Sequence, residues 1–208
     1  MRVPNLILSL LLILFTQSKT VWIMLFIYGL IKAIQNRKIN KPVLLTVSLL
    51  IIILPFLFLF LGNVSYLSTF TGRTIIWNFT LDAWQQNKLF GYGMGLWNEE
   101  MFLQYKHLIK EGWVFSHAHS QYYQTLGETG IIGLILLFIY YTVLVYCGVK
   151  YIEETKGLSY YFALFMIIRG WTEPVFRHFF IDFNFLIHLL IFTYLILITK
   201  KTEKTNVM

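Results

Sequence analysis

Arg73 and His119 are the residues with the most suggestive chemistry in the polar stretch 72–130, which lies between two long apolar runs. A guanidinium offers a planar fork of donors that suits phosphate oxygens. Arg73 also comes just before a predicted helix, whose N-terminal amides favour an anion. An imidazole titrates near neutral pH and can accept a proton from a hydroxyl. On the residues alone, Arg73 could equally anchor a lipid headgroup, and His119 could be an ordinary polar side chain.

A second histidine, His117, lies two residues before His119. On an extended segment the two rings point the same way and, together with His107, could bind a metal ion. No cysteine or HExxH pattern supports that interpretation, so we predict a site with no metal and no cofactor. The segment Gly91–Gly95 lacks the strand and crossover helix of a nucleotide-binding fingerprint and predicts a tight loop.

Five further charged residues are candidates for the same site. Glu128, just before an apolar run, could partner a histidine or an arginine, and Lys19 adds another cation. Arg169, Glu173 and Arg177 lie on a short break between apolar runs, where charge near hydrocarbon is costly and often functional. Arg169 and Glu173 are four residues apart and could pair.

The elements that must hold these residues are typical of a membrane protein. The 208 residues are 57% hydrophobic and 13% charged, whereas a soluble domain carries roughly a quarter charged residues. The net charge of +7 is distributed between apolar runs rather than in a nucleic-acid-binding patch, and the single cysteine excludes a disulfide within the chain. We therefore predict an all-α, polytopic membrane helix bundle.

The apolar runs predict about six transmembrane helices. Their ranges are Val3–Phe15, Val21–Ala33, Val43–Gly62 (with Pro55 inside), Ile131–Val149, Leu158–Ile168 and Phe179–Thr199. The predicted organisation is transmembrane helices 1–3 over 1–62, a catalytic loop over 63–130, helices 4–6 over 131–199 with a short outer loop near 169–179, and a tail over 200–208. The start of the chain lacks a small-residue cleavage site, which favours a first membrane helix over a signal peptide.

The basic residues orient the bundle. Arg37, Lys38, Lys150 and Lys200 all fall in short connections on one side, and such loops lie in the cytoplasm under the positive-inside rule. Both termini are then cytoplasmic, and the loop 63–130 is extracytoplasmic. This loop contains short interfacial helices, one of them predicted at Thr74–Trp84 with Trp77, Leu81 and Trp84 on one face.

The order of these motifs resembles the O-antigen ligase and polymerase superfamily of bacterial membrane glycosyltransferases. The matching pieces are Gln17–Thr20, Gly72–Arg73 with Trp77, Leu89–Gly95, Ala118–Tyr123 and Leu126–Leu134. The similarity covers roughly residues 5–190. Two positions depart from the family pattern: Lys19 stands where arginine is usual, and Ser120 stands where asparagine is usual.

The resemblance implies inverting transfer or polymerisation of a glycan from undecaprenyl diphosphate to an acceptor hydroxyl, on the outer face of the bacterial plasma membrane, with no metal. Arg73, Lys19 and Arg177 would bind the diphosphate, His119 would act as general base, and Glu128 would orient it. The aromatic side chains that could contact the glycan or the membrane interface are Trp77, Trp84, Tyr92 and Tyr122. The acceptor would be a glycan, a lipid or a protein.

Two alternatives accompany this interpretation. Family members are longer, so the chain corresponds to their C-terminal half, and it could be an inactive partner subunit that works with a missing N-terminal half or with other polysaccharide-assembly proteins. A polysaccharide transporter would need polar residues within the spans, and the predicted spans have few.

Overall fold

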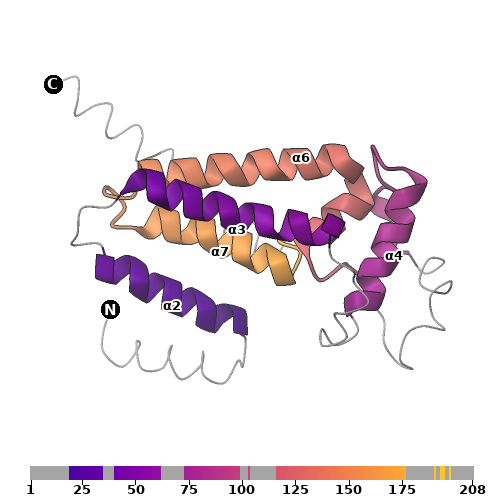
Figure 1. Cartoon of the computed structure of the whole chain (residues 1–208), viewed down its shortest axis with the longest axis horizontal. Helices are drawn as coiled ribbons and strands as arrows, with labels where there is room; N and C mark the ends of the chain where they lie inside the picture. The colour runs from indigo at the N-terminus through magenta and orange to yellow at the C-terminus, as the bar shows by residue number, and fades with distance from the viewer. Residues whose placement is uncertain are drawn as a thin grey trace. The chain divides into compact units, whose positions relative to one another are not determined.

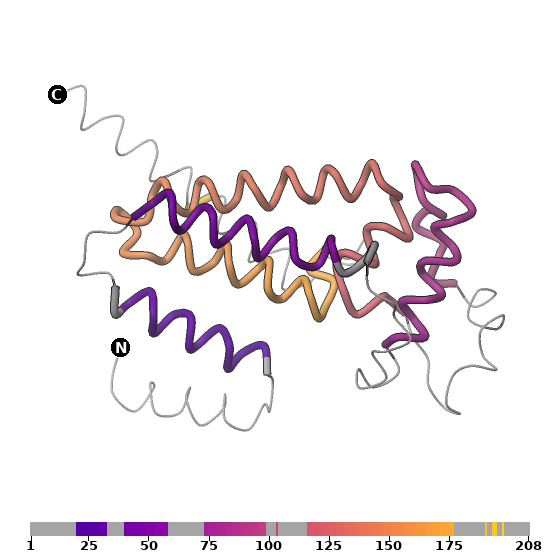
Figure 2. Tube along the Cα trace, viewed as in Figure 1, coloured from indigo at the N-terminus to yellow at the C-terminus, as the bar shows by residue number. Residues whose placement is uncertain are grey.

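The computed structural model describes residues 19–34, 40–61, 73–98, 103, 116–176, 190, 193–194 and 197. Every regular element in these ranges is helical (Figures 1 and 2), which confirms the all-α class. The chain divides into two compact units, Met1–Ile39 and Asn40–Met208. In the first unit the described element is the apolar helix α2, Lys19–Ile34, which confirms the helix predicted over Val21–Ala33.

Three helices of the second unit pack along one another: α3 (Lys41–Leu61), α6 (Gln121–Lys150) and α7 (Leu158–Thr172) (Figure 1). The turn 151–157 reverses the chain between α6 and α7. The largest side chains fully buried in α6 and α7 are Tyr122, Tyr141, Leu126, Leu144, Met166 and Ile167. These helices form the body against which the site is built.

The described helices carry the composition of membrane segments. Helix α6 is long and apolar enough to cross a bilayer, and shorter apolar helices cover Thr20–Lys32 and Lys41–Leu57. Large apolar side chains are exposed along α3 and α6, among them Leu50, Leu54, Leu136 and Ile139, and such surfaces are typical of membrane contact. The predicted spans over 3–15 and, apart from isolated residues, 179–199 lie outside the described residues, so the six-span topology and its orientation stay predictions.

Helix α7 is longer than the sequence predicted. The predicted span ended at Ile168 because Arg169 and Gly170 looked like a break, but the helix continues to Thr172. Tertiary packing overrides the low helix propensity of glycine here. A Cβ on Gly170 would lie 2.7 Å from the Tyr141 hydroxyl, so the bare glycine lets α7 approach α6 closely. The extra turn carries Glu173 to the helix end.

The predicted interfacial helix is present as α4, Arg73–Gln86, packed against α6. Its buried side chains are Ile76, Trp77, Phe79, Thr80 and Ala83, so one residue of the predicted aromatic face, Trp77, is covered by protein. The core cluster contains Ile76, Phe79 and Ala83 with Leu96 of the short 3-10 helix η2, Met94–Trp97. The spacing i, i+3, i+7 of the smaller apolar residues therefore decides which face is covered.

The glycine-rich loop closes a break in α6. Gly130 has φ 64° and ψ −158°, which separates a first helical segment, 121–129, from the predicted fourth span that begins at Ile131. Tyr92 donates its N–H to the Gly127 carbonyl at 2.8 Å, and Ile131 donates to the Lys88 carbonyl at 3.0 Å. The tight loop thus supplies partners to backbone groups that the break would leave unpaired.

Replacing Gly130 with alanine should destabilise the fold. The new Cβ would lie 2.6 Å from the Gly91 amide nitrogen and also meet the Leu89 carbonyl, at a φ that side chains rarely adopt. We expect the free energy of unfolding to fall by about 3 kcal/mol from overpacking and backbone strain, measured by chemical denaturation in detergent. Gly95→Ala is the matched control, because no described atom lies within 4 Å of its Cβ. Equal stability of both variants would contradict this account of the loop.

Candidate active site

The loop Ser116–Ser120, just before α6, presents the two histidines. Between them Ala118 is fully buried and held at both backbone groups: its N–H donates to Gln124 Oε1, and its carbonyl accepts from Trp77 Nε1, each at 2.8 Å. His117 and His119 project together, with ring centroids 4.0 Å apart, although the backbone at His119 is not extended as the sequence argument assumed. His119 has a φ of 50°, an unusual backbone conformation that is found disproportionately at functional positions.

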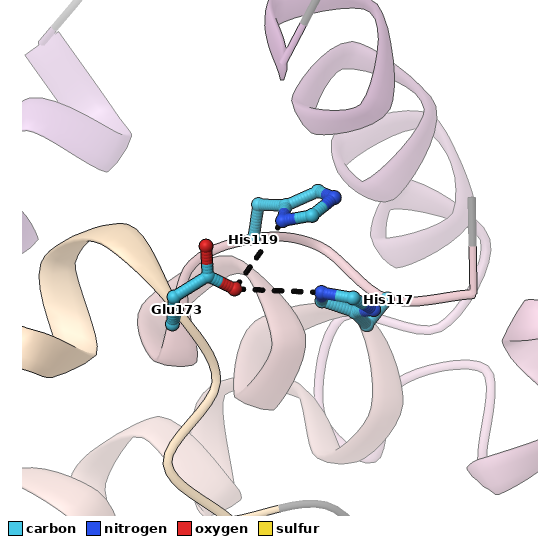
Figure 3. A group of neighbouring side chains, drawn as sticks. All are labelled: His117, His119 and Glu173. Carbon is cyan, nitrogen blue, oxygen red and sulfur yellow. Dashed lines mark hydrogen bonds and ion pairs between the residues drawn. The ribbon is translucent and has the colours of Figure 1, made fainter. Parts of the chain in front are cut away.

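Both imidazoles meet the carboxylate of Glu173, the residue that follows α7 (Figure 3). Oε2 lies 3.3 Å from His119 Nδ1 and 3.5 Å from His117 Nε2. The other oxygen, Oε1, lies 3.2 Å from Arg73 Nη2, and Arg73 Nη1 donates to the Thr172 carbonyl at 3.1 Å. The start of α4, the histidine loop and the end of α7 thus meet at one carboxylate.

These contacts keep Glu173 ionised. Burial by itself raises the pKa of the carboxyl, but hydrogen bonds from His117 and His119 and electrostatic interactions with His119 and Arg73 outweigh it. The pKa of Glu173 consequently lies well below its usual range. A permanent negative charge here can hold cationic or donating partners in fixed positions.

Glu173→Gln should make the stability of the folded chain less dependent on pH in the acid range. The folded carboxyl has a pKa below the ordinary 4.5, so its stabilisation is fully present above that value. As pH falls below that value, the Glu173 carboxyl of the unfolded chain takes up a proton before that of the folded chain does, so the stabilisation declines. The wild type should melt at a higher temperature than the variant at pH 7, and the two should converge in stronger acid. Melting curves in detergent with chelator test this, and a constant gap down to pH 2 would contradict it.

Glu128 does not occupy the position predicted for it. Its side chain is buried on α6 and accepts a hydrogen bond from Gln124 Nε2. Since Gln124 also binds the Ala118 amide, Glu128 supports the histidine loop through Gln124. Within the described ranges, the carboxylate that contacts His119 is that of Glu173. The sequence analysis placed Glu173 on the break between apolar runs but predicted that it pairs with Arg169.

The contacts around Glu173 do not test the other two cations, Lys19 and Arg177, that were predicted to bind the diphosphate. Lys19 begins α2 in the first compact unit, and Arg177 lies outside the described residues. Their predicted binding of a diphosphate stays a prediction.

The four aromatic residues predicted to contact the glycan or the membrane interface differ in burial. Trp77 is 6% exposed and stacks on Tyr123 with centroids 4.7 Å apart. Tyr122 is 1% exposed and packs edge-on against Phe56. Other side chains of the protein cover these two rings, so the rings support the site without lining it. Tyr92, which is exposed, and the half-buried Trp84 stay candidates for glycan or membrane-interface contact.

Parts of the chain are similar to known proteins. A family model described as O-Antigen ligase matches residues 4–138. The "Exopolysaccharide production protein ExoQ" of Rhizobium meliloti (strain 1021) is 35% identical over 83 residues, which are 38% of this chain and 19% of that relative. The chain is thus similar to a small part of that protein's length. No solved structure matches the chain. The family match includes Arg73 and His119 and ends before Glu173.

Proposed function

The chain belongs to the O-antigen ligase family, and on that premise we propose that it transfers a glycan from a polyprenyl diphosphate carrier to an acceptor hydroxyl. Membership in this family and the similarity to ExoQ support a bacterial membrane protein of surface polysaccharide biosynthesis. The carrier in this proposal is undecaprenyl diphosphate, as the family resemblance implies, and the reaction lies on the outer membrane face, as the positive-inside rule predicts. The observation that carries the proposal is that one carboxylate joins Arg73 and His119.

Arg73 binds the diphosphate and stabilises the charge that develops on it. The bond that breaks joins the anomeric carbon to a phosphate oxygen, and its electron pair leaves with the diphosphate. Arginine has five donors; two of them hold Thr172 and Glu173 here, which fixes the direction of the guanidinium. Positioned donors in a site partly shielded from water stabilise a developing anion strongly. The α4 N-terminus adds amides of the same polarity.

His119 accepts the proton of the attacking hydroxyl. Its Nδ1 faces Glu173, whereas its other ring nitrogen, Nε2, points away from that carboxylate (Figure 3). A proton on Nδ1 that is donated to Glu173 leaves the lone pair on Nε2. As the acceptor oxygen bonds to the anomeric carbon, its proton moves to Nε2, and Glu173 stabilises the resulting imidazolium. Attack opposite the departing diphosphate inverts the anomeric configuration. Glu173 is thus a positioning residue.

The test is transfer by the full chain in lipid nanodiscs. The donor is undecaprenyl diphosphate bearing a labelled glycan, and a chelator is present throughout. We expect labelled product together with free undecaprenyl diphosphate. A parallel test restores surface polysaccharide in a strain that lacks the cognate enzyme. Failure of the intact gene to release the carrier or to restore polymer in either setting would overturn the proposal.

A further inference from the structure

We propose that His117, His119 and Glu173 bind a zinc-class divalent ion, and that the bound ion switches the transfer site off. The three residues offer one ligand atom each, all within 4.8 Å of one another. Zinc holds histidine nitrogen and carboxylate oxygen at about 2.0–2.2 Å, in tetrahedral geometry. Two ligands on such a tetrahedron lie about 3.4 Å apart by simple geometry. The observed separations from Glu173 Oε2 are 3.3 Å to His119 and 3.5 Å to His117.

The surrounding groups fit a metal site as well. Two imidazoles and one glutamate form a ligand set that zinc uses in proteins while keeping an open position for water. His117 Nδ1 lies 3.2 Å from Ser116 Oγ, and Arg73 engages the second oxygen of Glu173. Outer contacts of this kind orient metal ligands. A single carboxylate is too few oxygens for calcium or magnesium, so the site selects a zinc-class ion.

Metal binding would remove the catalytic base, a consequence that rests on the proposed function. The ion takes the lone pair of His119 Nδ1, so the ring proton of the neutral imidazole moves to Nε2. A protonated Nε2 cannot accept the proton of the attacking hydroxyl. The same ion holds Glu173 Oε2, which otherwise orients the ring. One ion therefore blocks the base without contacting the Arg73 guanidinium.

The binding test uses the full chain in nanodiscs and needs no activity. Zinc chloride is titrated against a chromophoric chelator, and Co²⁺ is used as a spectroscopic substitute. We expect one ion per chain and the visible absorption of tetrahedral Co²⁺. His117→Asn and Glu173→Gln should each weaken zinc binding at least about tenfold. His107→Asn is the matched control, because the sequence-based ligand set would include His107 and the set proposed here does not.

Three results would overturn the site: no saturable zinc binding by the wild type, an octahedral Co²⁺ spectrum, or a loss in His107→Asn as large as in Glu173→Gln. Zinc should also inhibit transfer, and His117→Asn, measured against its own metal-free rate, should need at least about tenfold more zinc for the same inhibition. Tight zinc binding with an unchanged transfer rate would overturn the switch alone. Absent transfer in chelator alongside normal zinc binding would overturn the proposed function instead.

Discussion

His119→Ala should lower the rate of glycan transfer by about 10²–10⁴-fold, the usual contribution of a positioned general base. The imidazole is held on one side by Glu173 and fixed by the buried Ala118 next to it. Alanine removes the proton acceptor but leaves the backbone contacts of the loop unchanged. The initial rate of undecaprenyl diphosphate release, measured at saturating donor with chelator present, reports the effect.

His117→Ala is the matched control for this prediction. His117 meets the same oxygen of Glu173, but the proposed mechanism gives it no proton to move. Its loss should slow transfer by less than about tenfold, in line with the loss of one partly buried hydrogen bond near the site. Equal losses in the two variants would contradict the assignment of the base to His119 and would favour a shared structural role.

Arg73→Ala should lower the transfer rate by about 10²–10³-fold, as removal of one preorganised donor to a developing anion does in other enzymes. The guanidinium is fixed by the Thr172 carbonyl and by Glu173 before any substrate binds. Arg73→Lys keeps the charge but loses the planar fork, so its rate should fall between those of wild type and alanine. The loss should appear in kcat as well as in KM, because the charge on the diphosphate grows in the transition state.

Thr74→Ala supplies the comparison for Arg73. Thr74 is the next residue of α4 and carries no charge, so its loss leaves the proposed anion site intact. Alanine keeps the backbone amide at this half-buried position, so we expect the transfer rate to stay within about twofold of wild type. If Arg73→Ala and Thr74→Ala behave alike, the diphosphate is bound elsewhere, and Lys19 and Arg177 become the residues to test.

The helices could be predicted where the amino-acid composition alone marks them. Long apolar runs predicted α2, α3 and α6, and the boundary at Gly130 was visible because a polar segment ends there. The end of α7 and the buried face of α4 were not predicted. Both depend on tertiary contact: Gly170 is accommodated by Tyr141, and the face of α4 is chosen by Leu96 of η2. Local propensity carries no information on such partners.

The residues of the site could likewise be predicted only in part from the sequence. Arg73 and His119 carry side chains with distinctive chemistry, so residue type and order were enough to select them. The residue predicted to orient His119 was Glu128, which is close to it in sequence but is buried beside Gln124. Glu173 is 54 residues from His119 and 100 residues from Arg73. Such pairing exists only in the folded chain, and the clue in the sequence was a charged residue on a break between apolar runs.

This separation along the chain sets an order of events during synthesis. A ribosome delivers Arg73 and His119 long before Glu173, so a nascent chain bears both side chains without the carboxylate that joins them. Contacts between segments so far apart form late, because the entropy of closing long loops must be overcome first. We therefore expect the centre to mature only after α7 has emerged and docked, which keeps unfinished chains from consuming the lipid carrier.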